Sequence, residues 1–226
     1  MAISDFTIFL IDDDSRLLKA LTRLLQSVGY KTKAYSSSKT FLGEHDASIP
    51  GCAVLDLSMS GLNGLDVQHA LTRQGVDRPI IFLTGRGTIR ATVQAMKAGA
   101  IDVLLKPIDR RELLQAVKRA QEEDKMRRDI DAECRTVRAL LEELTPRERE
   151  VLTYVIAGLR NKQIAATLGT VEKTIKVHRG RVMGKMRAGS VAELVRMTEK
   201  LSWQSGEIMN SIALKANSTN GFILKQ

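Results

Sequence analysis

The sequence predicts an α/β domain built on a doubly wound parallel sheet, followed by an all-α domain of four helices that includes a helix-turn-helix. In the first 120 residues, short apolar runs alternate with stretches whose apolar residues recur at helical spacing, a pattern typical of a parallel sheet wrapped by helices. Beyond residue 144 the apolar runs give way to short helices with clear start signals. A length of 226 residues is enough for one to two domains.

Five strands are expected, at residues 7–11, about 31–35, 52–56, 80–84 and 103–106. The first, third and fourth are almost continuously apolar, as strands buried on both faces should be, whereas the second alternates and predicts an edge strand. Helices between the strands are indicated by three sets of apolar residues at helical spacing: Leu17, Leu18, Leu21, Leu24, Leu25 and Val28; Val93, Met96 and Ala100; Leu113, Leu114 and Val117. Gly29, Gly75 and Gly99 stand where helix ends favour glycine.

A charged stretch without glycine or proline, residues 121–143, predicts a helical linker. Its apolar stripe is too irregular to predict a coiled coil, so dimerisation through this helix stays an open alternative. We divide the chain into an α/β domain at 1–122, a linker at 123–143, a helical domain at 144–201 and a carboxyl-terminal extension at 202–226. The extension has a weak helical stripe of Ile208, Ile212 and Leu214, and it suggests no function.

The helical domain begins with a capping box, in which Thr145 is the N-cap, Pro146 the first helical residue and Glu148 the partner of the cap. A second helix starts at Asn161, a third runs from 172 to about 186, and a fourth spans 191–201. Two short helices joined by a tight turn with Gly169, the second of them strongly basic, predict the helix-turn-helix.

Composition limits the setting in which the chain works. It has 43% hydrophobic and 27% charged residues, ordinary values for a soluble globular protein. No stretch approaches the ~20 apolar residues of a membrane span, and the first residues lack a signal segment, so we expect a cytoplasmic protein without membrane association. Cys52 and Cys134 show no metal or redox spacing and are expected to be free thiols.

Carboxylates stand at the ends of two predicted strands. Asp12 and Asp13 follow the first strand and Asp56 ends the third. Because the carboxyl ends of parallel strands share one edge of the sheet, we expect these acids to converge there. Three adjacent carboxylates repel one another unless a positive charge lies among them. The pattern therefore predicts a divalent cation and an acidic side chain able to accept a phosphoryl group.

Positive charge is concentrated in the helical domain. Residues 160–200 contain ten Lys and Arg against three Glu, and so contribute +7 to a net charge of +9. Such density on short helices favours a polyanionic partner, nucleic acid first, and the alternative is a basic face that only contacts solvent.

These motifs resemble two known families. Residues 7–120 are similar to a response-regulator receiver domain, a flavodoxin-like (βα)5 fold, on the strength of Ile11-Asp12-Asp13-Asp14, Leu55-Asp56, Thr84-Gly85 and Lys106-Pro107 at successive strand ends. Residues 144–200 resemble the LuxR/FixJ (NarL/FixJ) type of four-helix DNA-binding domain, through Leu144-Thr145-Pro146-Arg147-Glu148-Arg149-Glu150-Val151-Leu152, Asn161-Lys162-Gln163-Ile164-Ala165 and Thr174-Ile175-Lys176-Val177-His178.

The receiver resemblance implies a role for each matching residue. Asp56 would be the phosphoacceptor, and Mg²⁺ would be held by Asp12, Asp13, Asp56 and the backbone carbonyl of Ser58. Lys106 would neutralise charge on the phosphoryl oxygens, and Thr84 would donate its hydroxyl to one of them and so transmit the switch. Pro107 resembles the family's cis proline, and an ordinary trans turn proline is the alternative.

Departures from the family pattern concern the switch. Val103 stands where the family often has Tyr or Phe, so a ring rotation coupled to Thr84 is in doubt. Ser60 stands where proline usually follows the methionine of the phosphorylation loop, which predicts a more mobile loop. Activation is expected through the face formed by the fourth helix and fifth strand, where Ile89, Val93 and Ile101 are either dimer contacts or core residues.

The DNA-binding resemblance implies that the third helix of the helical domain enters the major groove. Lys176 and Val177 are the base-edge candidates, and phosphate contacts are expected from Lys173, Thr174, Arg179, Lys162 and Lys185. Gly180 occupies a position that can carry a base-reading side chain, which predicts fewer base contacts. Asn161 and Thr170 are candidate caps of the second and third helices, and His178 is expected to be packed.

The resulting hypothesis is a DNA-binding transcriptional regulator, phosphorylated on Asp56 by a sensor histidine kinase with Mg²⁺, that dimerises and binds double-stranded promoter DNA beside RNA polymerase. Beyond its own phosphorylation and slow dephosphorylation it would not be an enzyme. One alternative is a phosphorylation-independent regulator with a vestigial receiver. Another is a Mg²⁺-dependent aspartyl-phosphate hydrolase of the haloacid dehalogenase kind, which expects an acid two residues after the nucleophile, where this chain has Ser58.

Overall fold

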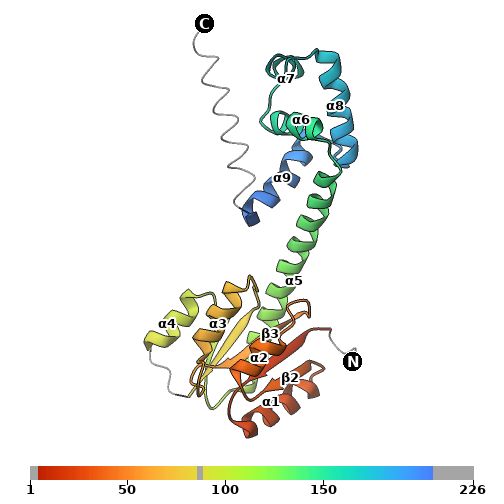
Figure 1. The fold of residues 1–226 in the computed structure, drawn as a ribbon. Helices are drawn as coiled ribbons and strands as arrows, with labels where there is room; N and C mark the ends of the chain where they lie inside the picture. Colours follow the sequence, from red (N-terminus) through yellow and green to blue (C-terminus); the bar gives the residue numbers. More distant parts are fainter. Residues whose placement is uncertain (1–4, 86–88, 206–226) are drawn as a thin grey trace. The chain divides into compact units, whose positions relative to one another are not determined.

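The computed structural model describes residues 5–85 and 89–205, except for the side chains of Ile89 and of residues 202–205. The chain divides into two compact units, Met1–Arg128 and Asp129–Gln226, and Figure 1 labels their helices and two of the strands, β2 and β3. The stripe of Ile208, Ile212 and Leu214 lies outside the described residues. None of the helices in the described part of the chain is long and apolar enough to cross a membrane.

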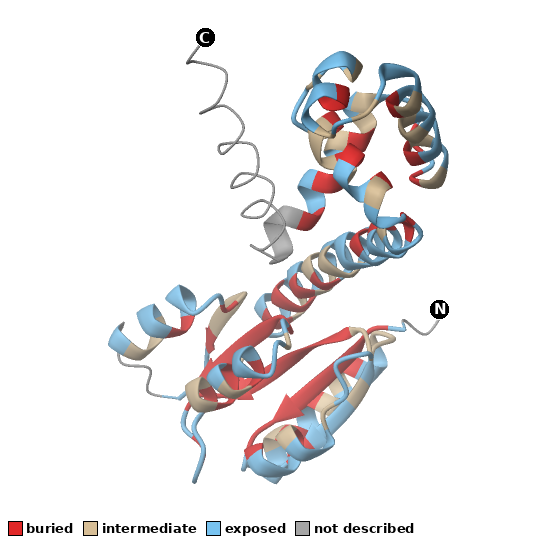
Figure 2. Ribbon diagram, turned by 45° about the horizontal axis from the view of Figure 1, so that its top comes forward, coloured by how far each residue is buried: buried red, intermediate tan, exposed pale blue. Residues whose placement is uncertain are grey.

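The first unit contains a five-stranded parallel sheet. Its strands are β1 (Thr7–Ile11), β2 (Lys31–Tyr35), β3 (Gly51–Asp56), β4 (Ile80–Thr84) and β5 (Asp102–Leu105), in the spatial order β2-β1-β3-β4-β5. All four neighbouring pairs are parallel. This is the predicted doubly wound sheet, with β2 at an edge as its alternating sequence indicated. Strands β1, β3 and β4 are buried along their whole length, as Figure 2 shows.

Helices cover both faces of the sheet because alternate strand residues point to opposite faces. One face packs against α1 (Ser15–Ser27) and the first half of α5 (Arg110–Glu142), with Ile8, Val54 and Leu113 in its core. The other face packs against α2 (Ser38–Glu44), α3 (Gly64–Arg73) and α4 (Ile89–Lys97), with Phe9, Leu55 and Phe82 in its core.

Two strands differ from the prediction, each by one residue at a boundary: β3 at its start, and β5 at both its start and its end. Strand β3 begins at Gly51, where a Cβ atom would lie 2.0 Å from the carbonyl oxygen of Thr7, so only glycine fits against β1. Strand β5 begins at Asp102, which pairs with Ile81, and ends before Lys106. The start of β5 was predicted one residue late because its first residue, Asp102, is polar and the prediction relied on apolar runs.

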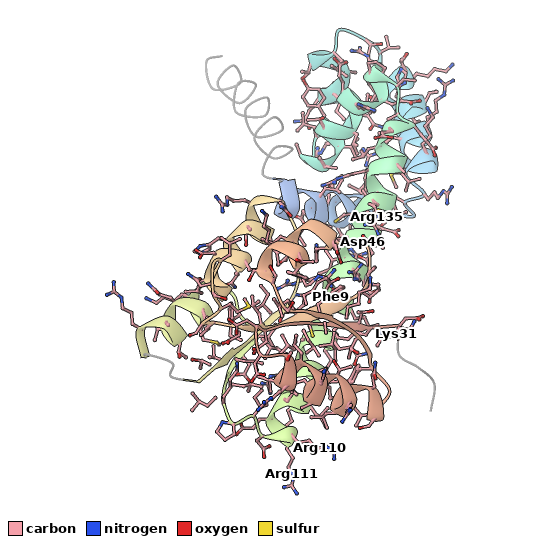
Figure 3. All side chains as sticks on the ribbon, turned by 60° about the horizontal axis from the view of Figure 1, so that its bottom comes forward. Phe9, Lys31, Asp46, Arg110, Arg111 and Arg135 are labelled. Atoms are coloured by element: carbon pink, nitrogen blue, oxygen red, sulfur yellow. The ribbon has the colours of Figure 1, made fainter. Side chains whose placement is uncertain are left out.

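The edge of the sheet where its strands begin is held by buried arginine. The Arg78 side chain is 6% exposed, and its guanidinium carbon lies 4.4 Å from the centre of the Phe9 ring. It donates hydrogen bonds to His45 Nε2 at 2.6 Å and to the carbonyl oxygens of Asp46 and Ile49. Figure 3 labels Phe9 inside this unit, and Arg110 and Arg111 projecting outward where α5 begins.

The second unit is helical. It contains the end of α5 together with α6 (Pro146–Ile156), α7 (Asn161–Thr167), α8 (Glu172–Lys185) and α9 (Val191–Ser205). Cys134, Val137 and Leu140 of α5 are buried in the core of this unit with residues from all four following helices. The predicted linker is therefore helical, but three residues of its apolar stripe are occupied by the unit's own core and are not available for a coiled coil.

Candidate functional site

The three acids of the predicted cluster meet at the carboxyl edge of the sheet. Asp12 follows β1, Asp56 ends the adjacent β3, and with Asp13 each supplies a carboxylate oxygen within 4.8 Å of the others. Asp12 and Asp56 are 1% and 6% exposed, whereas Asp13 is exposed. Two nearly buried carboxylates at this separation require a compensating positive charge.

Lys106 supplies positive charge in this structure. Its Nζ lies 2.7 Å from Asp12 Oδ2 and 3.0 Å from Asp56 Oδ2. Burial opposes the charged form of the lysine, but the hydrogen bonds to Asp12 and Asp56 outweigh it and raise the pKa of Lys106 above its usual value. The side chain is therefore an ammonium group at neutral pH. Lys106 directly follows β5, and its backbone N–H donates to the Thr84 carbonyl oxygen at 2.8 Å, which holds it against the end of β4.

The remaining predicted residues of this site lie at or just after the ends of β3, β4 and β5, and Val103 lies within β5. Thr84 ends β4 and is 1% exposed. The Ser58 backbone N–H donates to Asp56 Oδ1 at 3.1 Å, which orients the carboxylate. The peptide bond between Lys106 and Pro107 is cis, as the resemblance implied. Val103, which replaces the aromatic residue that the family often has, is half-buried and packs against the core that contains Phe82.

The donor set suits a hard divalent cation. Asp12, Asp13 and Asp56 offer only oxygen ligands, and an exposed Asp13 leaves room for water, which Mg²⁺ retains in most protein sites. The residues present therefore fit Mg²⁺. Ser58 remains the predicted source of a backbone carbonyl ligand.

Ser60 contacts this acid cluster, although its sequence position indicated only that a proline typical of the family is absent. Its backbone N–H and its hydroxyl both donate to Asp13 Oδ2, at 3.2 Å and 3.1 Å. The replacement of proline by serine at position 60 indicated that this residue can donate hydrogen bonds. Its partner, Asp13, lies 47 residues away and could not be identified from sequence spacing.

The second candidate site is the exposed surface of α8. Lys173, Lys176 and Val177 are exposed, Thr174 is half-buried, and Ile175 faces the core. Val177 is 49% exposed and Val171, the residue before the helix, is 64% exposed. Basic and apolar side chains therefore share one helix face, which can contact both phosphates and base edges. Lys162 is exposed on α7, the preceding helix.

Hydrogen bonds give two of the predicted phosphate contacts other partners. Arg179 donates to Asn161 Oδ1 at 3.1 Å, which ties α8 to α7. Lys185 donates to Glu148 Oε2 at 2.7 Å and to the Glu143 carbonyl oxygen at 3.0 Å. The side chain of Glu148 is only 3% exposed, so Lys185 compensates a nearly buried charge. Sequence reasoning missed this pair because Glu148 was already explained as part of the capping box.

The helix caps confirm one prediction and correct two. Thr145 and Glu148 form the predicted capping box. Asn161 is the first residue of α7 rather than its cap, because Arg160 takes the N-cap position and Asn161 bonds to Arg179. Val171 is the N-cap of α8 and makes no side-chain cap bond, so the expectation that Thr170 caps this helix is wrong.

The acid and lysine cluster on a doubly wound sheet, joined to a helix-turn-helix unit with a basic face, defines the class of two-component response regulators. Family models agree with both parts: residues 8–118 match the response regulator receiver domain, and residues 142–198 match the bacterial regulatory proteins of the luxR family. The chain belongs to the transcriptional response regulators that combine a receiver with a LuxR-type DNA-binding domain.

Individual relatives cover most of the chain. Nodulation protein W of Bradyrhizobium diazoefficiens is 45% identical over 194 residues, 86% of each chain. The transcriptional regulatory protein FixJ of Rhizobium meliloti is 37% identical over 196 residues, which cover 86% of this chain and 96% of FixJ. The solved response regulator StyR is 40% identical, with a TM-score of 0.76 over 87% of this chain and all of that one. These relatives indicate a regulator of transcription rather than a classical enzyme.

Proposed function

We propose that the chain is a transcriptional regulator switched by phosphorylation of Asp56, with a sensor histidine kinase as the donor and Mg²⁺ as the cofactor. The observation that carries the proposal is the geometry around Asp56. Asp56 is 6% exposed at the sheet edge, and both a lysine ammonium group and two further carboxylates lie beside its carboxylate. An acceptor, a metal site and a fixed positive charge are what phosphoryl transfer to an aspartate requires.

Each residue has a role in this transfer. One oxygen of Asp56 forms a bond to phosphorus while the bond between phosphorus and the donor group breaks, and the donor group leaves. Lys106 is placed to neutralise the negative charge on the phosphoryl oxygens, because its Nζ already lies 3.0 Å from Asp56 Oδ2. Asp12, Asp13, Asp56 and the Ser58 carbonyl would hold Mg²⁺, which supplies further charge neutralisation when bound.

Thr84 is the proposed sensor of the modification. Its side chain lies at the end of β4, next to β3 and Asp56, where a hydroxyl can donate to a phosphoryl oxygen. The shift would pass to α4 and β5, where Val93 is 44% exposed and Ile101 packs against the core. We propose this face for homodimerisation, with Val93 as the contact residue. The side chain of Ile89 lies outside the described residues.

For DNA we propose that α8 enters the major groove. Lys176 and Val177 would contact base edges, and Lys173, Thr174, Arg179 and Lys162 would contact phosphates. Lys185 stabilises the unit through Glu148 in this proposal, and a phosphate contact by Lys185 is secondary. The domain division at 1–122, 123–143, 144–201 and 202–226 remains a proposal, as do recruitment of RNA polymerase and a cytoplasmic location.

The test is phosphorylation of the full chain with a small phosphodonor and Mg²⁺, followed by DNA selection from a random library. We expect label on Asp56 and an increase in DNA affinity of about tenfold or more, comparable to an allosteric coupling of 1–3 kcal/mol. Asp56→Asn should remove both effects, whereas Asp129→Asn, which removes an exposed carboxylate of α5, should keep both. Label on the Asp56→Asn variant would contradict the proposal, and unchanged affinity after labelling would favour a vestigial receiver.

A further inference from the structure

The loop that follows Asp56, residues 57–63, is held from outside at two points. Ser60 donates from its backbone N–H and from its hydroxyl to Asp13 Oδ2, at 3.2 Å and 3.1 Å. Ser38 of α2 donates its hydroxyl to the Leu62 carbonyl oxygen at 2.9 Å. Between these two points Gly61 has a φ of 91°, a left-handed conformation that favours glycine. Hydrogen bonds therefore anchor the loop on both sides of a glycine turn, and the expected greater mobility of this loop stays a prediction.

A proline at position 60 could make neither of the bonds to Asp13, because it has no N–H and no hydroxyl. Proline would restrict the backbone at this position through its fixed φ, whereas Ser60 restrains the loop through two hydrogen bonds to Asp13 of the acid cluster. The residues it links follow different strands, since Asp13 lies after β1 and Ser60 lies after β3.

We propose that Ser60 is a positioning residue for Mg²⁺, acting through the carboxylate of Asp13. This inference rests on the proposed function, in which Asp13 is a metal ligand. Both hydrogen bonds end on Oδ2, so they orient the carboxylate and leave Oδ1 without a bond from Ser60. Groups that bond to a ligating carboxylate in this way fix its orientation before the metal arrives, and their loss typically weakens metal binding about 10–100-fold.

The hydrogen bonds from Ser60 matter for metal binding because Asp13 is exposed to solvent. Asp12 and Asp56 are nearly buried and are already oriented by Lys106, at 2.7 Å and 3.0 Å from its Nζ. Asp13 is exposed, so its side chain would otherwise sample several rotamers in water. The cost of ordering it on metal binding is reduced when Ser60 holds it in advance.

The experiment is a calorimetric titration of the full-length, unphosphorylated chain with MgCl2. Ser60→Ala, which removes one of the two donors, should weaken Mg²⁺ binding about threefold to tenfold, and Ser60→Pro, which removes both, should weaken it by more than about tenfold. Ser60→Thr keeps both donors and should bind within about twofold of the parent chain. The melting temperature without Mg²⁺ identifies any variant that fails to fold.

Ser38→Ala is the matched control, because it releases the loop at Leu62 without touching Asp13. If Ser38→Ala weakens Mg²⁺ binding as much as Ser60→Ala does, loop stiffness explains the effect and the proposal is wrong. Equal affinities of Ser60→Ala and the parent chain would also overturn it, while leaving the proposed function intact. A parent chain that binds no Mg²⁺ would instead overturn the proposed function, and this inference with it.

Discussion

The Lys106 ammonium group lies 3.0 Å from the Asp56 carboxylate, and the same Nζ is 2.7 Å from Asp12. One lysine thus compensates two nearly buried acids. A divalent cation would perform the same compensation, so Lys106 and a bound Mg²⁺ would neutralise the same negative charge.

Replacing Lys106 by Met should therefore lower the stability of the chain without metal and strengthen Mg²⁺ binding about threefold or more. The uncompensated acids repel one another and gain more from a cation. The rise in melting temperature on adding Mg²⁺ should be larger than in the parent chain. Lys118→Met, an exposed position on α5, should leave that rise unchanged. A smaller rise in Lys106→Met would contradict this account of the cluster.

DNA binding should separate the two kinds of contact proposed for α8. Lys173→Ala should weaken binding to all sequences alike and reduce the slope of log affinity against log salt by about one, as the loss of one phosphate contact does. Lys176→Ala should cost about 1–3 kcal/mol and relax preference at one base pair. Binding assays on substituted operators at several salt concentrations measure both effects. Lys19→Ala, on α1, should change neither the slope nor the preference.

The ion pair between Glu148 and Lys185 should stabilise the helical unit. Glu148 Oε2 accepts from Lys185 Nζ at 2.7 Å and from the Thr145 backbone N–H at 2.9 Å. Lys185→Met removes the charged partner of Glu148 and leaves it the Thr145 backbone bond, which should cost about 1–2 kcal/mol of unfolding free energy in urea titrations because Lys185 is itself partly exposed. Arg181→Met, at an exposed position of the same helix, should change it by less than about 0.5 kcal/mol.

The same pair predicts an acid dependence. The hydrogen bond from Lys185, with that from the Thr145 backbone, lowers the pKa of Glu148 to about 2. A carboxylate with a depressed native pKa contributes stability that is present above its unfolded pKa and lost as the pH falls toward the native one. The parent helical unit should therefore lose stability between about pH 4.5 and pH 2. Glu148→Gln should be less stable at pH 7 and should lose less in that window.

His45 predicts a second pH dependence, in the receiver. Burial, and then the charge of Arg78, lower the pKa of His45 to about 4. The Arg78 side chain donates to His45 Nε2 at 2.6 Å, which requires a neutral imidazole. In the unfolded chain the imidazole takes up its proton near pH 6.5, so the native state should lose stability as the pH falls from about 6.5 to about 4.

A comparison of urea unfolding at pH 7 and pH 5 measures this effect. His45→Gln keeps an acceptor for Arg78 and removes the titration, so its stability should fall less between the two pH values than that of the parent chain. His69→Gln, an exposed position on α3, should behave like the parent chain. A fall in His45→Gln equal to that of the parent would show that other groups cause the dependence.

The sequence by itself was sufficient to predict the five strands, the helices α1, α4 and α5, and the sheet edge that carries Asp12 and Asp56, whereas α2 and α3 were not predicted individually. The predicted strands follow from local periodicity, and Asp12 and Asp56 were expected to converge because parallel strands place their carboxyl ends at one edge. The places of Thr84 and Lys106 beside them were implied by the resemblance to receiver domains. The capping box of Thr145 and Glu148 was equally predictable, since its two members are three residues apart.

The tertiary structure decided which partners meet across long stretches of chain. Ser60 and Asp13 are 47 residues apart, Lys185 and Glu148 are 37 apart, and Arg179 and Asn161 are 18 apart. It also decided that α5 contributes Val137 to the helical core instead of leaving it for a coiled coil. Such contacts depend on how separate elements pack against one another, whereas periodicity and capping report only on neighbours along the chain.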